Sequence, residues 1–272
     1  MAESNPYDAT PLWRARETVA DRLAAAPGVV CCLDFDGVLA PIVDDPGAAA
    51  MPPPLRERLV ALRECESVRV AVVSGRELED LRDRVDVDGL AYAGNHGLER
   101  RVDGQRSVAA AARRSTAAVS RVCDRLGDRL AHVPGVGIED KDLTATVHVR
   151  GVPDERVPEV ERVVGETVEE VTTADGGSLE IRDGKAIREI RPAVGWDKGR
   201  AVDRLVDEAP DGWLPLYVGD DVTDEDAFEA LRERDRGFGV LVGERGTAAD
   251  YRLESQRAVR ELLDLIVDAR CE

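Results

Sequence analysis

Short apolar segments recur along the chain, and amphipathic segments of helical period separate them. The segments VVCCLDF, VRVAVVSGR and LPLYVGDD are almost entirely apolar until they end in polar residues, a pattern typical of central strands in a parallel sheet. LAYAGNHG and GFGVLVG read as further short strands. Helices are predicted at 10–26, 54–65 and 77–85, after WDKGR and near the C-terminus. This alternation predicts an α/β fold, a doubly wound, Rossmann-like parallel sheet.

The pattern changes in the middle of the chain. A helix rich in Ala and Arg is predicted over 107–130, and a charged helix over 153–170. Polar and apolar residues alternate over 143–149, as in a half-exposed strand. SLEIRDGKAIREIRP reads as a hairpin with Asp183-Gly184 at its turn. We therefore expect a smaller inserted α+β domain.

The predicted organisation has four parts. They are an N-terminal helical extension (1–26, with Thr10 as its N-cap residue and Pro11 in its first turn), a first core part (27–112), the insertion (113–188) and a second core part (189–272).

Composition narrows the classes of partner. The formal net charge of the 272 residues is −18, which argues against nucleic acid because that partner favours a basic surface. No apolar run is long enough for a bilayer, and the N-terminus lacks the pattern of a secretion signal, so we expect a cytoplasmic protein without membrane contact. The five cysteines lack metal-ligand spacing, and we expect reduced thiols.

Arg supplies nearly all the positive charge. The three lysines are Lys141, Lys185 and Lys198. An acidic, lysine-poor surface suits concentrated salt, because salt screens self-repulsion. This motivates the hypothesis of a salt-rich habitat.

Polar side chains follow several predicted strands: Asp34 and Asp36, then Ser74, then Asn95 and His96, then Asp220 and Asp221. Ligands bind open parallel sheets at the carboxyl ends of strands, so we expect these residues in one crevice. Two carboxylates 4 Å apart repel by about 4 kcal/mol at an effective dielectric near 20, and a hard cation bound by oxygen ligands removes that conflict. The sequence therefore predicts a Mg²⁺ site.

A carboxylate beside Mg²⁺ suits phosphoryl transfer through an aspartyl phosphate. A second acid two residues away can protonate the leaving oxygen and then activate water. Gly37 allows a tight turn beside the phosphate, Ser74 can donate to a phosphoryl oxygen, and Lys198 can bridge nucleophile and phosphate. The alternative is structural: strand-end Asx turns for Asp34 and Asp36, or a capping box from Thr223 to Asp226.

The motifs also resemble known ones. Four stand in the order found in haloacid dehalogenase-like (HAD) phosphatases: Asp34-Phe35-Asp36-Gly37, Ser74-Gly75-Arg76, Asp197-Lys198-Gly199, and Gly219-Asp220-Asp221 with Asp224. From about residue 29 to 266 the chain is similar to the trehalose-6-phosphate phosphatases, whose signatures resemble DFDGVLAPI, SGR, GNHGLE, EDKDLTATVHVR, EIRP, DKG and GDDVTDEDAF. Val38 departs from the Thr frequent in this superfamily.

The resemblance implies that the insertion is the cap domain of this family, and it implies a role for each matched residue. Asp34 is the nucleophile and a Mg²⁺ ligand, and Asp36 is the general acid and base that gives its backbone carbonyl to the metal. Ser74 and Lys198 bind phosphate. Asp220 is a metal ligand supported by Asp221 and Asp224. The expected substrate-binding residues are Ser74, Gly75, Arg76, Asn95 and His96 in the core, and Glu139, Lys141 and Glu189 in or beside the cap.

The implied activity is hydrolysis of trehalose 6-phosphate, a small sugar phosphate, with a trehalose-phosphate synthase in the same pathway as the expected partner. Three alternatives stay open at this point. One is another HAD sugar phosphatase, acting on sucrose phosphate or mannosyl phosphoglycerate. The second is a phosphomutase or phosphotransferase, and the third is a sugar-phosphate sensor that kept the fold.

Overall fold

The computed structural model describes residues 8–43, 45–175, 178–184, 186–234 and 236–271. The chain divides into two compact units. One takes in the chain up to Ser107 and from Asp197 onward, and the other is Val108–Trp196. The sequence-based boundaries at 113 and 188 fall inside the second unit. The segment 8–26, expected as a separate extension, belongs to the first unit.

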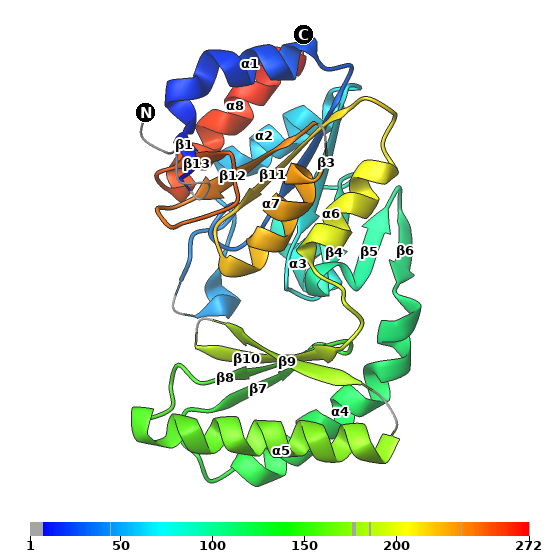
Figure 1. The fold of residues 1–272 in the computed structure, drawn as a ribbon, viewed down its shortest axis with the longest axis vertical. Helices are drawn as coiled ribbons and strands as arrows, with labels where there is room; N and C mark the ends of the chain where they lie inside the picture. Colours follow the sequence, from blue (N-terminus) through cyan, green and yellow to red (C-terminus); the bar gives the residue numbers. More distant parts are fainter. Residues whose placement is uncertain (1–7, 44, 176–177, 185, 235, 272) are drawn as a thin grey trace. The chain divides into compact units, whose positions relative to one another are not determined.

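The first unit is built on one mixed sheet, whose strands among the described residues run in the order β1-β13-β12-β11-β2-β3-β4-β5-β6 (Figure 1). Neighbours from β1 to β4 are parallel, and β5 joins β4 antiparallel. The strand bounds are β1 Thr10–Pro11, β2 Val29–Leu33, β3 Val68–Val73, β4 Ala91–Gly94, β5 Glu99–Val102, β6 Gln105–Val108, β11 Leu214–Gly219, β12 Phe238–Val242 and β13 Tyr251–Leu253.

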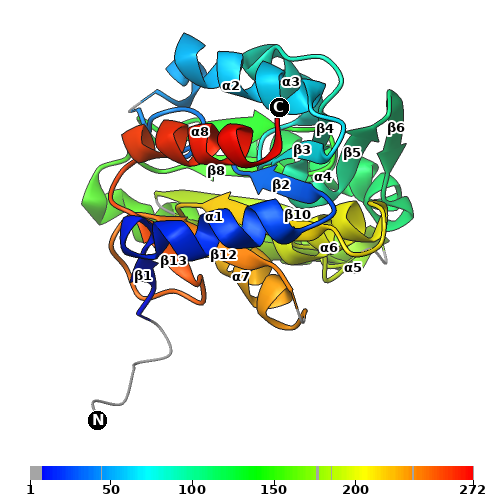
Figure 2. The same cartoon turned by 90° about the horizontal axis from the view of Figure 1, so that it is seen from above.

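Helices cover both faces of this sheet. Figures 1 and 2 show α2 packed beside α8, and α6 beside α7. The helix bounds are α1 Arg16–Ala25, α2 Pro53–Glu64, α3 Leu78–Val85, α6 Lys198–Asp207, α7 Glu225–Arg232 and α8 Val259–Arg270. Single 3-10 turns are η1 Leu12–Ala15, η2 Pro46–Ala48, η3 Asn95–Gly97, η5 Val222–Asp224 and η6 Gln256–Ala258.

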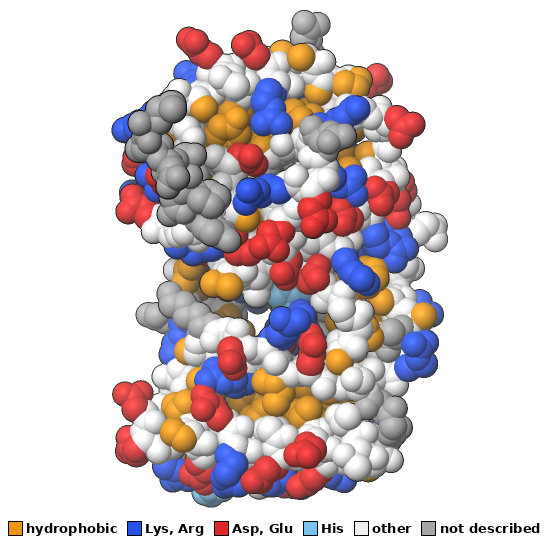
Figure 3. All heavy atoms as spheres, in the orientation of Figure 1, with side chains coloured by type: hydrophobic (Ala, Val, Ile, Leu, Met, Phe, Trp, Pro, Cys, Tyr) orange, Lys and Arg blue, Asp and Glu red, His pale blue; other side chains and the backbone are white. Residues whose placement is uncertain are grey.

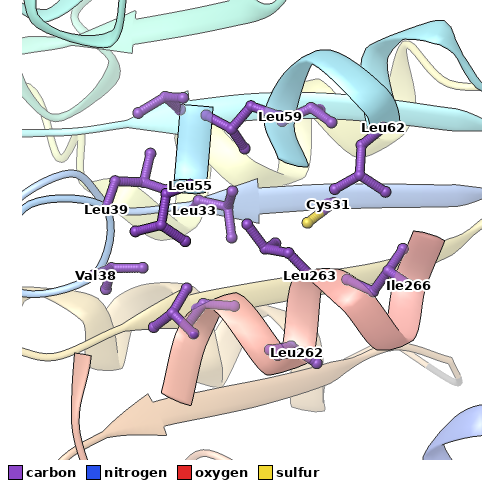
Figure 4. Close-up of a cluster of buried hydrophobic side chains, with 14 of the residues drawn as sticks. Cys31, Leu33, Val38, Leu39, Leu55, Leu59, Leu62, Leu262, Leu263 and Ile266 are labelled. Atoms are coloured by element: carbon purple, nitrogen blue, oxygen red, sulfur yellow. The ribbon is translucent and has the colours of Figure 1, made fainter. Parts of the chain in front are cut away.

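The central strand β2 is buried on both faces because its side chains alternate between two cores. Cys31 and Leu33 face the core that contains leucines of α2 and α8 (Figure 4). Val30 and Cys32 face the core formed with α6 and α7. All five residues of β2 are fully buried, so the strand is a rigid support for the residues that follow it.

The predicted first helix begins later than expected. Thr10 and Pro11 pair with Tyr251 and Arg252 of β13, so Thr10 is not a helix cap. The hairpin of β5 and β6 and the short strand β13 were not predicted, since their sequences are too short and polar to show a strand period.

The second unit is an antiparallel sheet of order β7-β8-β10-β9 that packs with two helices. Its elements among the described residues are α4 Ala110–Leu130, β7 Gly137–Asp140, β8 Ala145–His148, η4 Asp154–Arg156, α5 Val157–Asp175, β9 Leu179–Gly184 and β10 Ile187–Pro192. Buried Val147 and Ile190 from the sheet meet Val122 and Leu126 of α4. The α+β character of the insertion is confirmed.

The predicted turn of the β9–β10 hairpin is wrong by two residues. Gly184 pairs with Ile187 and Asp183 with Arg188, so Asp183 and Gly184 belong to the ladder. An Asp-Gly pair favours a tight turn, but the register here is set by the whole strand, because a shift by one residue would turn Ile190 out of the core.

The expectation that all the cysteines are reduced is wrong for one pair. Cys65 and Cys271 form a disulfide, with Cα atoms 5.3 Å apart. They lie at the C-terminal ends of α2 and α8, which pack against each other. Because 206 residues separate them, only the fold brings them together. Cys31, Cys32 and Cys123 are free thiols.

None of the helices in the described ranges is both long and apolar enough to cross a bilayer.

Candidate active site

The predicted residues of the first unit gather where its parallel strands end. Asp34 and Asp36 follow β2, Ser74 follows β3, Asn95 and His96 follow β4, and Asp220 and Asp221 follow β11. The parallel neighbours β11, β2, β3 and β4 bring these ends to one edge of the sheet. The residues that follow these strands therefore lie along one edge of the sheet, as the strand-end rule predicts.

Asp34 is held by a buried lysine. Its Oδ2 accepts a hydrogen bond from Lys198 Nζ at 2.7 Å, and its Oδ1 accepts one from the backbone N–H of Phe35 at 2.7 Å. Both side chains are almost fully buried. Lys198 begins α6, whose N-cap residue is Asp197. Burial raises the pKa of Asp34 well above its usual range, despite the lowering effect of Lys198.

Asp224 is the second partner of Lys198, at 2.7 Å from Oδ1. The same oxygen accepts a hydrogen bond from Tyr217 Oη at 2.6 Å, and Oδ2 accepts from the N–H groups of Asp220 and Asp221, each at 2.8 Å. Burial opposes its ionisation, but Lys198, Tyr217 and the backbone donors hold the pKa of Asp224 below its usual value. With four donors, Asp224 is an ionised anchor rather than an open ligand.

The capping box predicted from Thr223 to Asp226 is displaced in the structure. It runs from Asp221 to Asp224 instead, at the start of η5. Asp221 is exposed, and its Oδ1 accepts from the N–H of Val222 at 2.8 Å. Capping is therefore one function of these acids, and Asp220 is the member whose side chain is left beside Asp34.

The donor set of this cluster fits a hard cation. Carboxylate oxygens of Asp34, Asp220 and Asp224 all lie within 4.8 Å of one another. Burial, with the nearby charge of Asp224, raises the pKa of Asp220 to about 7. The single positive charge of Lys198 therefore does not balance the carboxylates of this cluster. Carboxylate oxygens are also the ligands that Mg²⁺ prefers. Gly37, at φ +75°, lies against Asp220: a Cβ there would stand 2.0 Å from Asp220 Oδ2.

Asp36 is bound by Arg76 rather than by the lysine cluster. Arg76 Nε donates to Asp36 Oδ2 and Arg76 Nη2 donates to Asp36 Oδ1, both at 2.7 Å. Arg76 also bonds to Asp80 and to the carbonyl of Pro46. The structure therefore places Arg76 at the acid expected to move protons.

Ser74, Gly75, Asn95 and His96 form one connected loop region. Ser74 is buried; its Oγ accepts from the N–H of Arg76 at 3.2 Å, and its carbonyl accepts from the N–H of His96 at 2.9 Å. A Cβ on Gly75 would stand 2.6 Å from His96 Nε2, so glycine permits that ring to lie close. Asn95 and His96 both have positive φ, a constraint typical of functional loops.

Glu99 fixes this loop and was not predicted as a functional residue. It is 1% exposed; its Oε1 accepts from Asn95 Nδ2 and from the N–H of Leu78, and its Oε2 accepts from Arg106 Nη2, each at 2.9 Å. The glutamate at the end of GNHGLE therefore holds Asn95 and the start of α3 together.

Two further residues that support the site were not predicted from the sequence. The first is Tyr217, which donates to Asp224. A tyrosine in an otherwise aliphatic strand indicates a polar partner nearby, because a buried hydroxyl needs a hydrogen bond. Arg245 pairs with Glu225 and donates to the carbonyl of Asp221 at 2.6 Å. Glu225 accepts in turn from the N–H of Ala248 at 2.7 Å. This network ties the acidic loop after β11 to the segment after β12.

The three expected sugar contacts lie on the sheet of the second unit or beside it. Glu139 on β7 and Glu189 on β10 both stand opposite Thr146 of β8, so they share one row across the sheet. Lys141 Nζ is 3.9 Å from Glu139, and His148 Nε2 lies 2.9 Å from the same carboxylate. Glu189 is buried, and Glu139 is 49% exposed by side chain.

The surface agrees with the acidic composition. On the face shown in Figure 3, the basic side chains (Lys and Arg) are interspersed with Asp and Glu and do not form one basic patch.

Comparison with known proteins identifies the family. The family model described as trehalose-phosphatase matches residues 32–257. The chain belongs to the trehalose-phosphatase family. Trehalose-phosphate phosphatase B of Arabidopsis thaliana is 34% identical over 257 residues, covering 88% of this chain and 66% of that protein. Trehalose-phosphate phosphatase of Mycobacterium marinum is 37% identical over 239 residues, covering 84% and 58%.

Solved structures agree with the trehalose-phosphatase assignment. The C-terminal domain of the Candida albicans trehalose-6-phosphate phosphatase superposes with a TM-score of 0.77 at 26% identity, covering 97% of this chain and 99% of that one. A haloacid dehalogenase-like hydrolase from Bacteroides thetaiotaomicron shares the fold at 16% identity, with a TM-score of 0.60 and coverage of 88% and 97%. The predicted HAD core with a cap is thus confirmed. The chain spans less than two thirds of the length of the two curated relatives above.

Proposed function

We propose that this chain hydrolyses trehalose 6-phosphate to trehalose and inorganic phosphate through an aspartyl phosphate. One observation carries the proposal. In a chain of the trehalose-phosphatase family, the Asp34 carboxylate stands at the end of a buried central strand, 2.7 Å from Lys198 Nζ. A nucleophile on a rigid strand, paired with a point charge, is what phosphoryl transfer requires.

The reaction has two steps. In the first, an Asp34 oxygen bonds to phosphorus, the bond from phosphorus to the sugar oxygen breaks, and Asp36 gives its proton to that oxygen. In the second, Asp36 takes a proton from water, the water oxygen attacks phosphorus, and the bond to Asp34 breaks. Lys198 offsets negative charge on Asp34 and on the phosphoryl oxygens, and Ser74 donates to one of those oxygens.

Mg²⁺ would be held by the side chains of Asp34 and Asp220 and by the backbone carbonyl of Asp36. When bound, it neutralises phosphoryl charge and helps to orient the group for in-line attack. Asp224 accepts hydrogen bonds from the backbone N–H groups of Asp220 and Asp221, and these bonds hold the loop that carries Asp220 in place. Asp221 supports the same loop by capping η5.

Sugar recognition is proposed for Asn95, His96 and the Gly75 backbone in the first unit, and for Glu139, Lys141 and Glu189 in the second. Carboxylates and an ammonium are suitable partners for the many hydroxyls of a disaccharide. The protein is proposed to act in the cytoplasm, after a trehalose-phosphate synthase that makes its substrate.

A phosphate-release assay across sugar phosphates tests the proposal. We expect turnover of trehalose 6-phosphate in Mg²⁺ to exceed that of sucrose 6-phosphate and mannosyl phosphoglycerate. Activity on one of those with none on trehalose 6-phosphate would overturn the substrate assignment. Solvent oxygen-18 should appear in the released phosphate, whereas a mutase or phosphotransferase returns the group to a sugar. Binding without release would indicate a sensor.

A further inference from the structure

Arg76 holds both carboxylate oxygens of Asp36. The two hydrogen bonds, from Nε and Nη2, are each 2.7 Å long, which is the parallel fork of a bidentate pair. The Asp36 side chain is 43% exposed, so burial alone does not fix its rotamer. Its orientation is therefore set mainly by the guanidinium.

Arg76 is itself held on several sides. Nη1 donates to Asp80 Oδ2 at 3.1 Å, and Nη2 also donates to the carbonyl of Pro46 at 2.9 Å. The guanidinium lies over the ring of Phe35, 5.3 Å from its centroid. Its side chain is 12% exposed. Arg76 thus joins the residues around Asp36 to η2 and to α3.

These contacts use most of the donor capacity of Arg76. A guanidinium has five N–H groups, and four of them are directed at Asp36, Asp80 and Pro46. A residue committed in this way has little left to offer a sugar hydroxyl. The charge-assisted fork to Asp36 is also the strongest kind of hydrogen bond in this set.

We infer that Arg76 is the positioning residue of the proton donor Asp36, rather than a ligand of the sugar. The inference rests on the proposed function and assigns a task within its first step. As the bond from phosphorus to the leaving oxygen breaks, that oxygen takes the proton of Asp36. Transfer requires the carboxyl group to lie within hydrogen-bond reach of that oxygen. A carboxyl group without its fork samples several rotamers and spends less time in reach.

The leaving group separates this role from sugar binding. A sugar alkoxide is a poor leaving group and needs a proton, whereas p-nitrophenolate leaves without one. The comparison is made on the first step alone, because Asp36 also acts in the second step, which both substrates share. In Arg76→Gln, the single-turnover rate constant for leaving-group release from trehalose 6-phosphate should fall by about 10- to 100-fold, since general acid catalysis contributes about 10²- to 10⁴-fold in all. With p-nitrophenyl phosphate, the same rate constant should fall by less than about threefold, because nucleophile, lysine and metal site are intact.

Arg76→Lys and Arg82→Gln complete the comparison. Lysine keeps the charge but cannot form the fork. The first-step rate constant of Arg76→Lys with the sugar phosphate should therefore lie between those of wild type and Arg76→Gln. Arg82 pairs with Glu79 on α3. Arg82→Gln is therefore the matched control, which also removes one arginine, and its rates with both substrates should stay close to those of wild type. Retained p-nitrophenyl phosphate turnover also shows that a variant is folded; if Arg76→Gln does not fold, Arg76→Lys carries the test.

Two results would overturn the inference. One is an equal loss of the first-step rate constant on both substrates, and the other is weaker binding of the sugar phosphate with that rate constant unchanged, which is the behaviour of a sugar ligand. Wild-type turnover of trehalose 6-phosphate tests the proposed function separately. If another sugar phosphate proves to be the substrate, the same leaving-group comparison is made with that compound.

Discussion

Tyr217, on the buried strand β11, donates a hydrogen bond at 2.6 Å to the Asp224 carboxylate, which also binds Lys198. Tyr217 sits on β11, and its ring packs edge-on against Phe228 of α7. Asp224 accepts hydrogen bonds from four donors, and the tyrosine hydroxyl is one of them. Through Asp224, a residue of the hydrophobic core sets the position of the site lysine and of the loop that carries Asp220.

Tyr217→Phe should therefore weaken both the fold and the site. Hydrogen bonds to charged groups contribute about 1.5–3 kcal/mol, and we expect a loss of that size in the free energy of unfolding. We also expect lower turnover and a higher Mg²⁺ concentration for half-maximal activity. Urea unfolding and a Mg²⁺ titration measure these changes. Tyr92→Phe is the matched control, since the Tyr92 hydroxyl donates to the Val87 carbonyl at 2.6 Å. It should lose stability but keep activity; the same kinetic loss in both variants would contradict a specific role for Tyr217.

Asp34→Asn should abolish turnover and leave the fold intact. An amide is neither a nucleophile nor a good metal ligand, although its oxygen can still accept from Lys198. Phosphate release and a thermal melt are the measurements. Asp203→Asn, which changes an acid paired with Arg234, should remain active. Substantial phosphate release by the Asp34 variant would mean that another group attacks phosphorus.

Stability of the metal-free protein should fall as pH rises. Burial and the charge of Asp224 raise the pKa of Asp220 from 3.8 to about 7. Between these values the folded state binds more protons at this site than the unfolded state, so the free energy of unfolding decreases with pH. The decrease is on the order of a few kcal/mol.

Mg²⁺ should remove most of that decrease, because it favours the ionised carboxylate. Urea unfolding in EDTA and in Mg²⁺, at about pH 5, 6 and 7, measures the difference. Asp220→Asn should flatten the dependence in EDTA. A gap between the EDTA and Mg²⁺ curves that does not widen with pH would count against a cation at this cluster.

Reduction of the Cys65–Cys271 disulfide should destabilise the protein. The bond closes most of the chain into a loop, and disulfides typically contribute about 2–4 kcal/mol. Unfolding of wild type with and without dithiothreitol measures the effect. Cys271→Ser should be as stable as reduced wild type, and dithiothreitol should not change its stability. Cys123→Ser should be as stable as wild type, because Cys123 is a free thiol. Equal stability of oxidised and reduced wild type would contradict this prediction.

Concentrated salt should raise the melting temperature. With a net charge of −18, the folded chain carries strong self-repulsion, which molar KCl screens. Thermal melts in low salt and in molar KCl make the comparison. Identical melting temperatures would remove the hypothesis of a salt-rich habitat.

Local signals made the core of the site predictable. Buried strands such as β2 and β11 show themselves as apolar runs, and the acids at their ends are visible because charge there is unusual. Asp34 and Asp220 come from distant parts of the chain, yet the rule that parallel strands end at one edge places them together. Lys198 begins helix α6, so its place beside Asp34 was indicated by its motif and not by that rule. The motif order then adds their roles.

Contacts fixed by side-chain packing were not predictable in the same way. The fork from Arg76 to Asp36 joins two loops, and Cys65 meets Cys271 only because α2 and α8 pack together. The β9–β10 turn was misplaced because an Asp-Gly signal is local, whereas register depends on the whole ladder. Glu99 and Tyr217 both carry a local signal, as the end of GNHGLE and as a tyrosine in an aliphatic strand, but the partners that they bind are set by the fold.

The position of β2 in the sheet also has a consequence during synthesis. Its two neighbours are β3, which follows it closely, and β11, which begins at Leu214. Until the ribosome has made β11, the strand that carries Asp34 has one bare edge, a state prone to wrong pairing. Lys198 and Asp220 also come late in the chain. A growing polypeptide therefore has no working site until most of it is made, and protection of the β2 edge is a task for chaperones or for rapid completion of the chain.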